Sequence, residues 1–178
     1  RYGIQLWEVL IKYGNQFGLT PYGTEAMHVL RAERGFIIVG QETDGTVSPI
    51  DLGMDWIISK KKKDFIGKRS LERASMKQND RKELVGLLSD DPNTVIPEGA
   101  HAIDEKDLEL EEKNILGHVT SSYFSSNCKR SIAMALIKNG RARKGNKLVI
   151  PLLNGDKIKA KIVNPVFFDP NGVRKNGI

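Results

Sequence analysis

Five strand-like segments follow one another in the second part of the sequence, and they constrain the fold more than any other feature. They are KELVGLLS (82–89), NILGHVTSSYF (114–124), SIAMALIK (131–138), NKLVIPLL (146–153) and KIKAKIVNPVFF (157–168). Gly, Pro, Asn and Asp separate them, as turns between strands require. Short strands at this spacing predict a small β-sandwich or a β-barrel.

The sequence before residue 80 has a different pattern. Apolar residues recur at helical spacing in 3–16 and predict a first helix that ends near Gly18. A second helix is predicted from Glu25 to Arg34, with Thr24 as its N-cap and a stop at the following glycine.

Two further strands are expected in this first part, FIIVG (36–40) and MDWIIS (54–59), with an Asp-Gly turn between them. A short helix should follow near residue 70. The fold class is therefore α+β, with an α+β domain over residues 1–79 and an all-β, barrel-like module over residues 80–178.

Composition excludes several classes of function. No apolar run among the 178 residues reaches the roughly 20 that a membrane helix needs. A single cysteine, Cys128, forms no internal disulfide and fits a reducing, cytoplasmic compartment. The net charge is +6, but the lysines are scattered apart from 60–63, and no aromatic residues accompany that run. We therefore expect neither membrane nor nucleic-acid binding. Because the chain starts without Met, we expect a fragment of a longer protein.

The common catalytic signatures are missing. The sequence has no Gly-rich phosphate loop, no paired cysteines and no Gly-x-Ser-x-Gly elbow. His28, His101 and His118 are not in metal-ligand spacing, so no metal is expected. The acidic residues 104–114 are predicted to form an exposed loop.

Arg31 stands out because a charged residue lies among apolar positions of the predicted helix. It follows apolar Leu30 and shares a helical stripe with Thr24 and Met27. Two roles fit this position. In the first, the stem of the side chain lies along the core and the guanidinium pairs with an acid. In the second, the planar guanidinium points into a cleft and binds a carboxylate or a polar heterocycle. Periodicity does not separate these two roles.

Longer motifs bear on that choice. They are Leu-Arg-Ala-Glu-Arg-Gly (30–35), Gly-Gln-Glu (40–42), Pro49, Asp-Phe-Ile-Gly-Lys (64–68) and LGHVTSSYFSSNCKRSIAMALI (116–137). Together they resemble the folate-binding region of the aminomethyltransferase (glycine-cleavage T-protein) superfamily. Within it, TPYGTEAMHVLRAERGFIIVGQETDGT (20–46) and PVFFDPNGVRKNG (165–177) resemble the C-terminal end of the alpha subunits of heterotetrameric sarcosine oxidases.

This resemblance implies the C-terminal part of an aminomethyltransferase-like folate-binding fold. Such enzymes oxidise sarcosine to glycine and pass the one-carbon unit to tetrahydrofolate, giving methylene-tetrahydrofolate. FAD, FMN and NAD serve the intact complex. They are not expected on this chain, which lacks Gly-x-Gly-x-x-Gly. The implied partners are folate and the other subunits, especially beta.

By the same resemblance, the residues expected at the tetrahydrofolate are Arg31, Glu42, Phe167 and Phe168. No catalytic residue is expected within the chain, because the family's acidic residue and pterin-binding segment lie further upstream. Glu33 is expected to hold the helix end, and Tyr123 and Phe124 to pack in the core.

Two other functions stay open. In the first, the chain is a fragment of another folate enzyme of the superfamily, such as a glycine-cleavage aminomethyltransferase or a dimethylglycine oxidase. In the second, it is a non-catalytic basic binding module.

Overall fold

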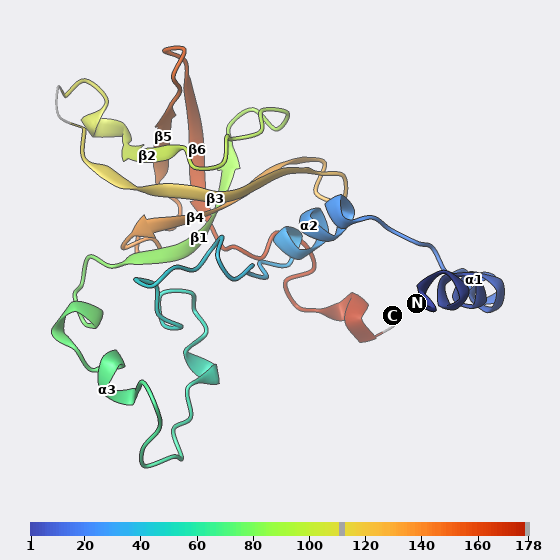
Figure 1. Ribbon diagram of the computed structural model, residues 1–178. Helices are drawn as coiled ribbons and strands as arrows, with labels where there is room; N and C mark the ends of the chain where they lie inside the picture. Colours follow the sequence, from blue (N-terminus) through green and yellow to red (C-terminus); the bar gives the residue numbers. More distant parts are fainter. Residues whose placement is uncertain (111–112, 177–178) are drawn as a thin grey trace.

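A closed antiparallel β-barrel forms the body of the molecule in the computed structural model, which describes residues 1–110 and 113–176 (Figure 1). Its strands are β1 (Lys82–Ser89), β2 (His101–Asp104), β3 (Ile115–Ser125), β4 (Arg130–Lys138), β5 (Lys147–Pro151) and β6 (Lys157–Val163). They pair in the order β1-β4-β3-β2-β5-β6, and β6 closes onto β1. The α+β class with a barrel-like module is confirmed, and the barrel replaces the sandwich.

Alternation of side chains explains the closed shape. In β6 both isoleucines and the alanine are buried, whereas all three lysines are exposed. The apolar residues of the barrel interior form one cluster, and its fully buried members include Leu87, Ile137 and Ile150. A closed barrel leaves no unpaired strand edge. The strands of this part of the chain therefore form their backbone hydrogen bonds with one another.

A β-bulge interrupts the pairing of β3 with β4. Val119 lies opposite Ala135, and Ser121 lies opposite Met134, so Thr120 is the extra residue. Its hydroxyl donates to the carbonyl of Met134 at 3.1 Å. Bulges redirect side chains, and this one turns Ser121 outward, toward the helix that covers the barrel.

That helix is α2 (Thr24–Glu33), which lies against the outer face of β3 and β4 (Figure 1). A second apolar cluster fills the space beneath it. The buried members of this cluster are Ala32, Leu84, Ile132, Met134 and Leu136. The molecule therefore has one core inside the barrel and another on its outside.

The other N-terminal elements are poorly covered. The first is α1 (Gly3–Gly14), which continues into η1 (Asn15–Phe17), lies apart from the barrel and buries none of its residues (Figure 1). The remaining short elements are η2 (Asp55–Ile57), α3 (Lys68–Leu71), η3 (Ala74–Met76), η4 (Glu105–Asp107) and η5 (Val173–Asn176). Within the described residues, no helix is both long and apolar enough to cross a bilayer.

Two predicted strands are wrong. Residues 36–38 have no regular structure and lead into a turn at 39–40, and residues 54–59 contain the 3-10 helix η2. No neighbouring strand pairs with either segment in the described chain, and an apolar sequence forms a strand only where a partner supplies hydrogen bonds. The predicted loop at 104–114 falls partly outside the described residues, and η4 occupies its first part.

Both long helices lie where their periodicity predicts. The predicted N-cap is wrong, because α2 already starts at Thr24 and Gly23 is its N-cap. The division into domains at residue 79 stays a prediction. Residues from both sides of it are joined, because the Leu84 amide of β1 donates to the Asp51 carbonyl at 2.9 Å.

Candidate functional site

The Arg31 guanidinium lies in a buried polar network between α2 and β3. Its side chain is only 10% exposed, and its Nη1 forms an ion pair with Glu42 Oε2 at 2.9 Å. Nη2 donates to the hydroxyl of Ser121 at 2.6 Å and to Tyr123 at 3.4 Å. Nη1 also donates to the carbonyl of Phe36 at 3.1 Å. Of the two roles open to Arg31, the structure gives it the pairing with a nearby acid.

Glu42 is fully buried, and its carboxylate is surrounded by donors. Besides Arg31, it accepts the amide of Ile38 at 2.7 Å and the hydroxyl of Ser121. One carboxylate therefore joins the helix, the turn after it and the outward-facing side of the bulged strand. Burying both charges is tolerable only because each has several partners. We call Arg31, Glu42 and Ser121 the Arg31 network.

Glu33 holds the other side of the helix end. Its buried carboxylate accepts Ser125 Oγ at 2.6 Å and Asn127 Nδ2 at 2.8 Å, both near the β3–β4 turn. Its backbone carbonyl accepts the amides of Phe167 and Phe168 at 2.9 and 3.0 Å. This arrangement agrees with the structural role expected for Glu33, and it also fixes the path of the C-terminal segment.

Phe167 and Phe168 line one cavity, of about 480 Å³, which we call the Phe168 cavity. Gly86 of β1 makes room for Phe167, because a Cβ there would lie 2.8 Å from the phenyl ring and 2.6 Å from the Asn164 carbonyl oxygen. Cys128 and Arg130 line the same cavity, and neither Arg31 nor Glu42 reaches it. The four residues expected at the folate are therefore split between two places, and their contact with folate stays a prediction.

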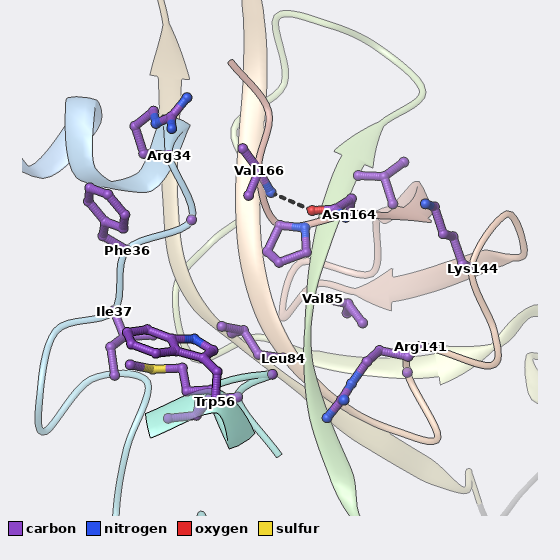
Figure 2. A pocket seen from close by; sticks show the side chains of 17 residues that line it. Arg34, Phe36, Ile37, Trp56, Leu84, Val85, Arg141, Lys144, Asn164 and Val166 are labelled. Carbon is purple, nitrogen blue, oxygen red and sulfur yellow. Dashed lines mark hydrogen bonds between the residues drawn. The ribbon is translucent and has the colours of Figure 1, made fainter. Parts of the chain in front are cut away.

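A second cavity, of about 740 Å³, lies beside the turn that follows α2; we call it the Trp56 cavity. Figure 2 shows Phe36, Ile37 and Trp56 on one side and Arg141 and Lys144 on the other. Its volume lies within the roughly 300–1,000 Å³ of ordinary small-molecule sites. Sequence reasoning missed this cavity, because its lining comes from six separated stretches of the chain.

The two cavities meet along the segment that follows β6. Lys144, Val163, Asn164 and Val166 line both of them. Four cationic side chains, Arg34, Arg130, Arg141 and Lys144, line one or the other, and no lining residue is an Asp or a Glu. The excess of positive charge suits an anionic group on an otherwise apolar ligand.

Asp51 secures the segment that carries the Trp56 cavity wall. Burial alone would raise the pKa of this carboxyl, but bonds from Arg81 and Ser48 outweigh it and hold the pKa below its usual value. Arg81 donates through Nε at 2.8 Å and through Nη2 at 2.5 Å, which is a bidentate fork. The same pairing raises the pKa of Arg81.

Two of the three histidines lie on neighbouring strands of the barrel. His101 on β2 and His118 on β3 lie directly opposite each other. Burial, together with the positive charges of Lys82 and His101, lowers the pKa of His118, although Asp44 opposes the shift. Among the described residues, no cluster of three or more His, Cys, Asp or Glu side chains is arranged to hold a metal ion.

Of the two aromatics expected in the core, Tyr123 packs against the outer cluster and Phe124 is 45% exposed. Tyr123 also lies near the guanidinium of Arg31, with its ring centre 5.8 Å from Cζ. Phe124 is therefore a correction: it lies on the face of β3 opposite to Tyr123, near the end of the strand, where it is only partly covered.

Comparison with known proteins gives two family matches. Residues 1–62 match the GCVT N-terminal domain, and residues 82–169 match the glycine cleavage T-protein C-terminal barrel domain. The sarcosine oxidase subunit alpha of Corynebacterium sp. strain P-1 is 48% identical over 99% of this chain. The alignment spans only 18% of that relative's own length.

More distant relatives share the same region. The aminomethyltransferase of Thermoanaerobacter pseudethanolicus is 30% identical over 96% of this chain and 44% of its own length. The crystal structure of glycine cleavage system aminomethyltransferase T from Bartonella henselae is similar in fold, with a TM-score of 0.78 over 94% of this chain and 44% of that one, at 24% identity. The chain therefore belongs to the aminomethyltransferase (glycine-cleavage T-protein) superfamily.

Proposed function

We propose that this chain is part of a sarcosine oxidase alpha subunit and helps to pass the one-carbon unit from oxidised sarcosine to tetrahydrofolate. The observation that carries the proposal is the 48% identity to a sarcosine oxidase alpha subunit over 99% of the chain. In the intact enzyme, FAD, FMN and NAD serve the oxidation and a beta subunit is the main partner. The complex is cytoplasmic under this proposal.

Two of the residues expected at the folate act by positioning. The two terminal nitrogens of Arg31 and both carboxylate oxygens of Glu42 are engaged within the protein, whereas Nε of Arg31 is buried without a hydrogen-bond partner. These bonds hold α2 and the turn after it against β3. The apolar wall for the folate comes from Phe167 and Phe168 on the Phe168 cavity, which has aromatic and cationic lining suited to a ring system that bears carboxylates.

The chain contributes orientation to the reaction. Tetrahydrofolate, when bound, supplies the nitrogen atoms that accept the one-carbon unit. Holding two reactants in a productive orientation is worth roughly 7–11 kcal/mol of barrier in favourable cases. The buried anchors of the Arg31 network, together with the backbone bonds from Glu33 to Phe167 and Phe168, keep the cavity walls rigid for that purpose.

Calorimetric titration of 5-formyl-tetrahydrofolate tests this function, both with the 178-residue chain and with an intact alpha subunit. Phe168→Ala should weaken binding about tenfold, since it removes an aromatic wall. Phe124→Ala is the matched control, because Phe124 is exposed and lines neither cavity. Binding by neither protein, with folding verified by circular dichroism, would overturn the proposal.

A glycine-cleavage aminomethyltransferase is the second candidate, favoured by the 30% identity to the Thermoanaerobacter enzyme over 96% of the chain. A partner assay separates the two. A sarcosine oxidase alpha subunit assembles with a beta subunit, whereas an aminomethyltransferase responds to a lipoylated carrier protein.

A further inference from the structure

We propose that the segment between η2 and β1 is the docking surface for the beta subunit, and that it recognises a cluster of Asp and Glu side chains on that subunit. We call residues 60–77 the basic lobe. This inference rests on the function proposed above, in which a beta subunit is the main partner, and it adds the place and the chemistry of the contact. It is carried by the distribution of charge along the chain and by the ion pairs that the structure contains.

The positive charge of the chain is concentrated in the basic lobe. These residues contain eight Lys and Arg but only two Asp and Glu, which gives the lobe a net charge of +6. Because the whole chain also carries a net charge of +6, the charges of all other residues cancel. A surface of one sign on an otherwise balanced protein steers and orients a partner of the opposite sign.

The cations of the basic lobe have no carboxylate partners of their own. Lysines 60–63 follow one another along the chain and are all exposed. Among the described residues, none of the eight cations of the lobe forms an ion pair with an Asp or a Glu. On the barrel, by contrast, Lys147 pairs with Asp90 at 2.7 Å. Four neighbouring like charges lie well within the Debye length of about 8 Å at physiological salt and repel one another, so the lobe is suited to an acidic surface from outside the chain.

An apolar groove accompanies the charges. It has a volume of about 400 Å³, and its lining includes Phe65, Ile66 and Leu71 together with Lys62. The side chain of Ile66 is fully exposed. Protein interfaces combine an apolar centre with a polar rim in this way. A partner protein can fill the groove with an apolar side chain while its carboxylates meet the lysines, and this combination favours a protein as the occupant.

The two ends of the basic lobe are tied together at the barrel. Asp51 precedes the lobe and Arg81 follows it, and Arg81 donates to both carboxylate oxygens of Asp51, through Nε at 2.8 Å and through Nη2 at 2.5 Å. Nη1 of Arg81 also donates to the carbonyl of Ser75 at 2.9 Å. From this base the lobe extends away from the barrel (Figure 1). A surface that is held in place before binding loses less conformational entropy when a partner docks.

Acetylation of lysines in the intact complex tests the place of the contact. The complex is treated with the N-hydroxysuccinimide ester of acetic acid, and the modified lysines are identified by mass spectrometry. Lysines 60–63 should stay unmodified at a reagent concentration that acetylates Lys157 and Lys161, which are exposed on the outside of β6. Acetylation of the four lobe lysines alongside Lys157 and Lys161 would overturn the inference.

Matched charge reversals in the full-length alpha subunit test the chemistry. Lys61→Glu/Lys62→Glu should weaken binding of the beta subunit by about tenfold, because like charges now meet at the interface. Lys157→Glu/Lys161→Glu makes the same change on the barrel and should leave the affinity unchanged. Lys61→Gln/Lys62→Gln removes the charges without reversing them and should lie between the two. Biolayer interferometry measures the affinities, and the differences should shrink as NaCl is added.

The outcomes separate this inference from the function on which it rests. If the two charge-reversal variants bind the beta subunit equally well, the place of the contact is wrong and the proposed function stands. If the lobe variant instead loses binding to vesicles of anionic phospholipid or to duplex DNA, with its affinity for the beta subunit intact, the partner is a membrane or a nucleic acid and the inference is overturned. If the unaltered full-length subunit binds no beta subunit, both proposals fail.

Discussion

The barrel and the N-terminal segment of this chain differ in how far their apolar side chains are buried. The barrel encloses its apolar residues within its own closed sheet, so Leu87 and Ile150 are completely buried. In α1, by contrast, Ile4 is 76% exposed and Trp7 is 56% exposed. The barrel therefore has the features of an independently stable unit, whereas the apolar residues of α1 contribute little to the stability of the described chain.

Between these regions lies α2, which joins the barrel through few but strong contacts. The Arg31 network and the bonds of Glu33 are buried and polar, and they lie on opposite sides of the helix end. The difference between the three regions predicts how much each substitution costs.

The largest effect is expected at the Arg31 network. Arg31→Ala should destabilise the chain by about 3–5 kcal/mol, because it leaves the fully buried Glu42 carboxylate without its cation. Urea unfolding monitored by circular dichroism measures the loss. Arg73→Ala, at an exposed arginine, is the control and should change stability by less than about 0.5 kcal/mol. Similar values for the two variants would mean that α2 is not anchored by this network.

A matched pair of leucines tests the contrast between the barrel and α1 directly. Leu87→Ala should cost about 3 kcal/mol, since it opens a cavity in the barrel interior. Leu10→Ala makes the same chemical change on α1, where the side chain is 53% exposed, and should cost less than about 0.5 kcal/mol. The comparison fails if both variants lose the same stability in urea.

A pair of glycines gives a smaller contrast. Gly86→Ala should cost about 2 kcal/mol, because its Cβ displaces the ring of Phe167 and presses on the Asn164 carbonyl. Gly3→Ala on α1 meets no atom within 4 Å and should be neutral or slightly stabilising. Thermal melts of both variants measure the difference, and a lower melting temperature for Gly3→Ala would contradict it.

The smallest effect concerns pH. The folded state lowers the pKa of His118 below its usual value of 6.5, chiefly through burial. The folded protein thus binds this proton less readily than the unfolded chain, so stability is complete above pH 6.5 and falls as the pH drops below it. His118→Gln should flatten the stability curve between pH 7 and pH 5, which are about the limits of histidine titration. An unchanged slope in His118→Gln would contradict the prediction.

Sequence patterns predicted the regular parts of the fold because those patterns are local. Strict alternation of lysine and apolar residues in 157–162 identifies β6 from the sequence alone, and glycines mark the ends of both long helices. The four-residue strand β2 was missed, since four residues are too few to show a period.

The two wrong strands have one physical cause. Residues 36–40 and 54–59 are apolar enough for strands, but strand formation depends on a partner, and the described chain provides none. The candidate site was predictable only in part for a similar reason. The pairing of Arg31 with an acid was foreseen as one alternative, whereas Ser121 as its third member depends on a bulge that the sequence does not reveal.

Because of the bulge at Thr120, the number of residues in β3 decides which side chain faces Arg31. In a strand that alternates without interruption, Val119 and Ser121 would point to the same side, and Thr120 would lie beneath Arg31. The extra residue shifts the alternation of inward and outward side chains by one position. The place of Ser121 in the Arg31 network therefore depends on the number of residues in the strand as well as on their identity. A strand shortened by Thr120 keeps the same outward set. If the bulge moved to another position in the β3–β4 hairpin, a different residue would lie beneath Arg31 although the composition had not changed.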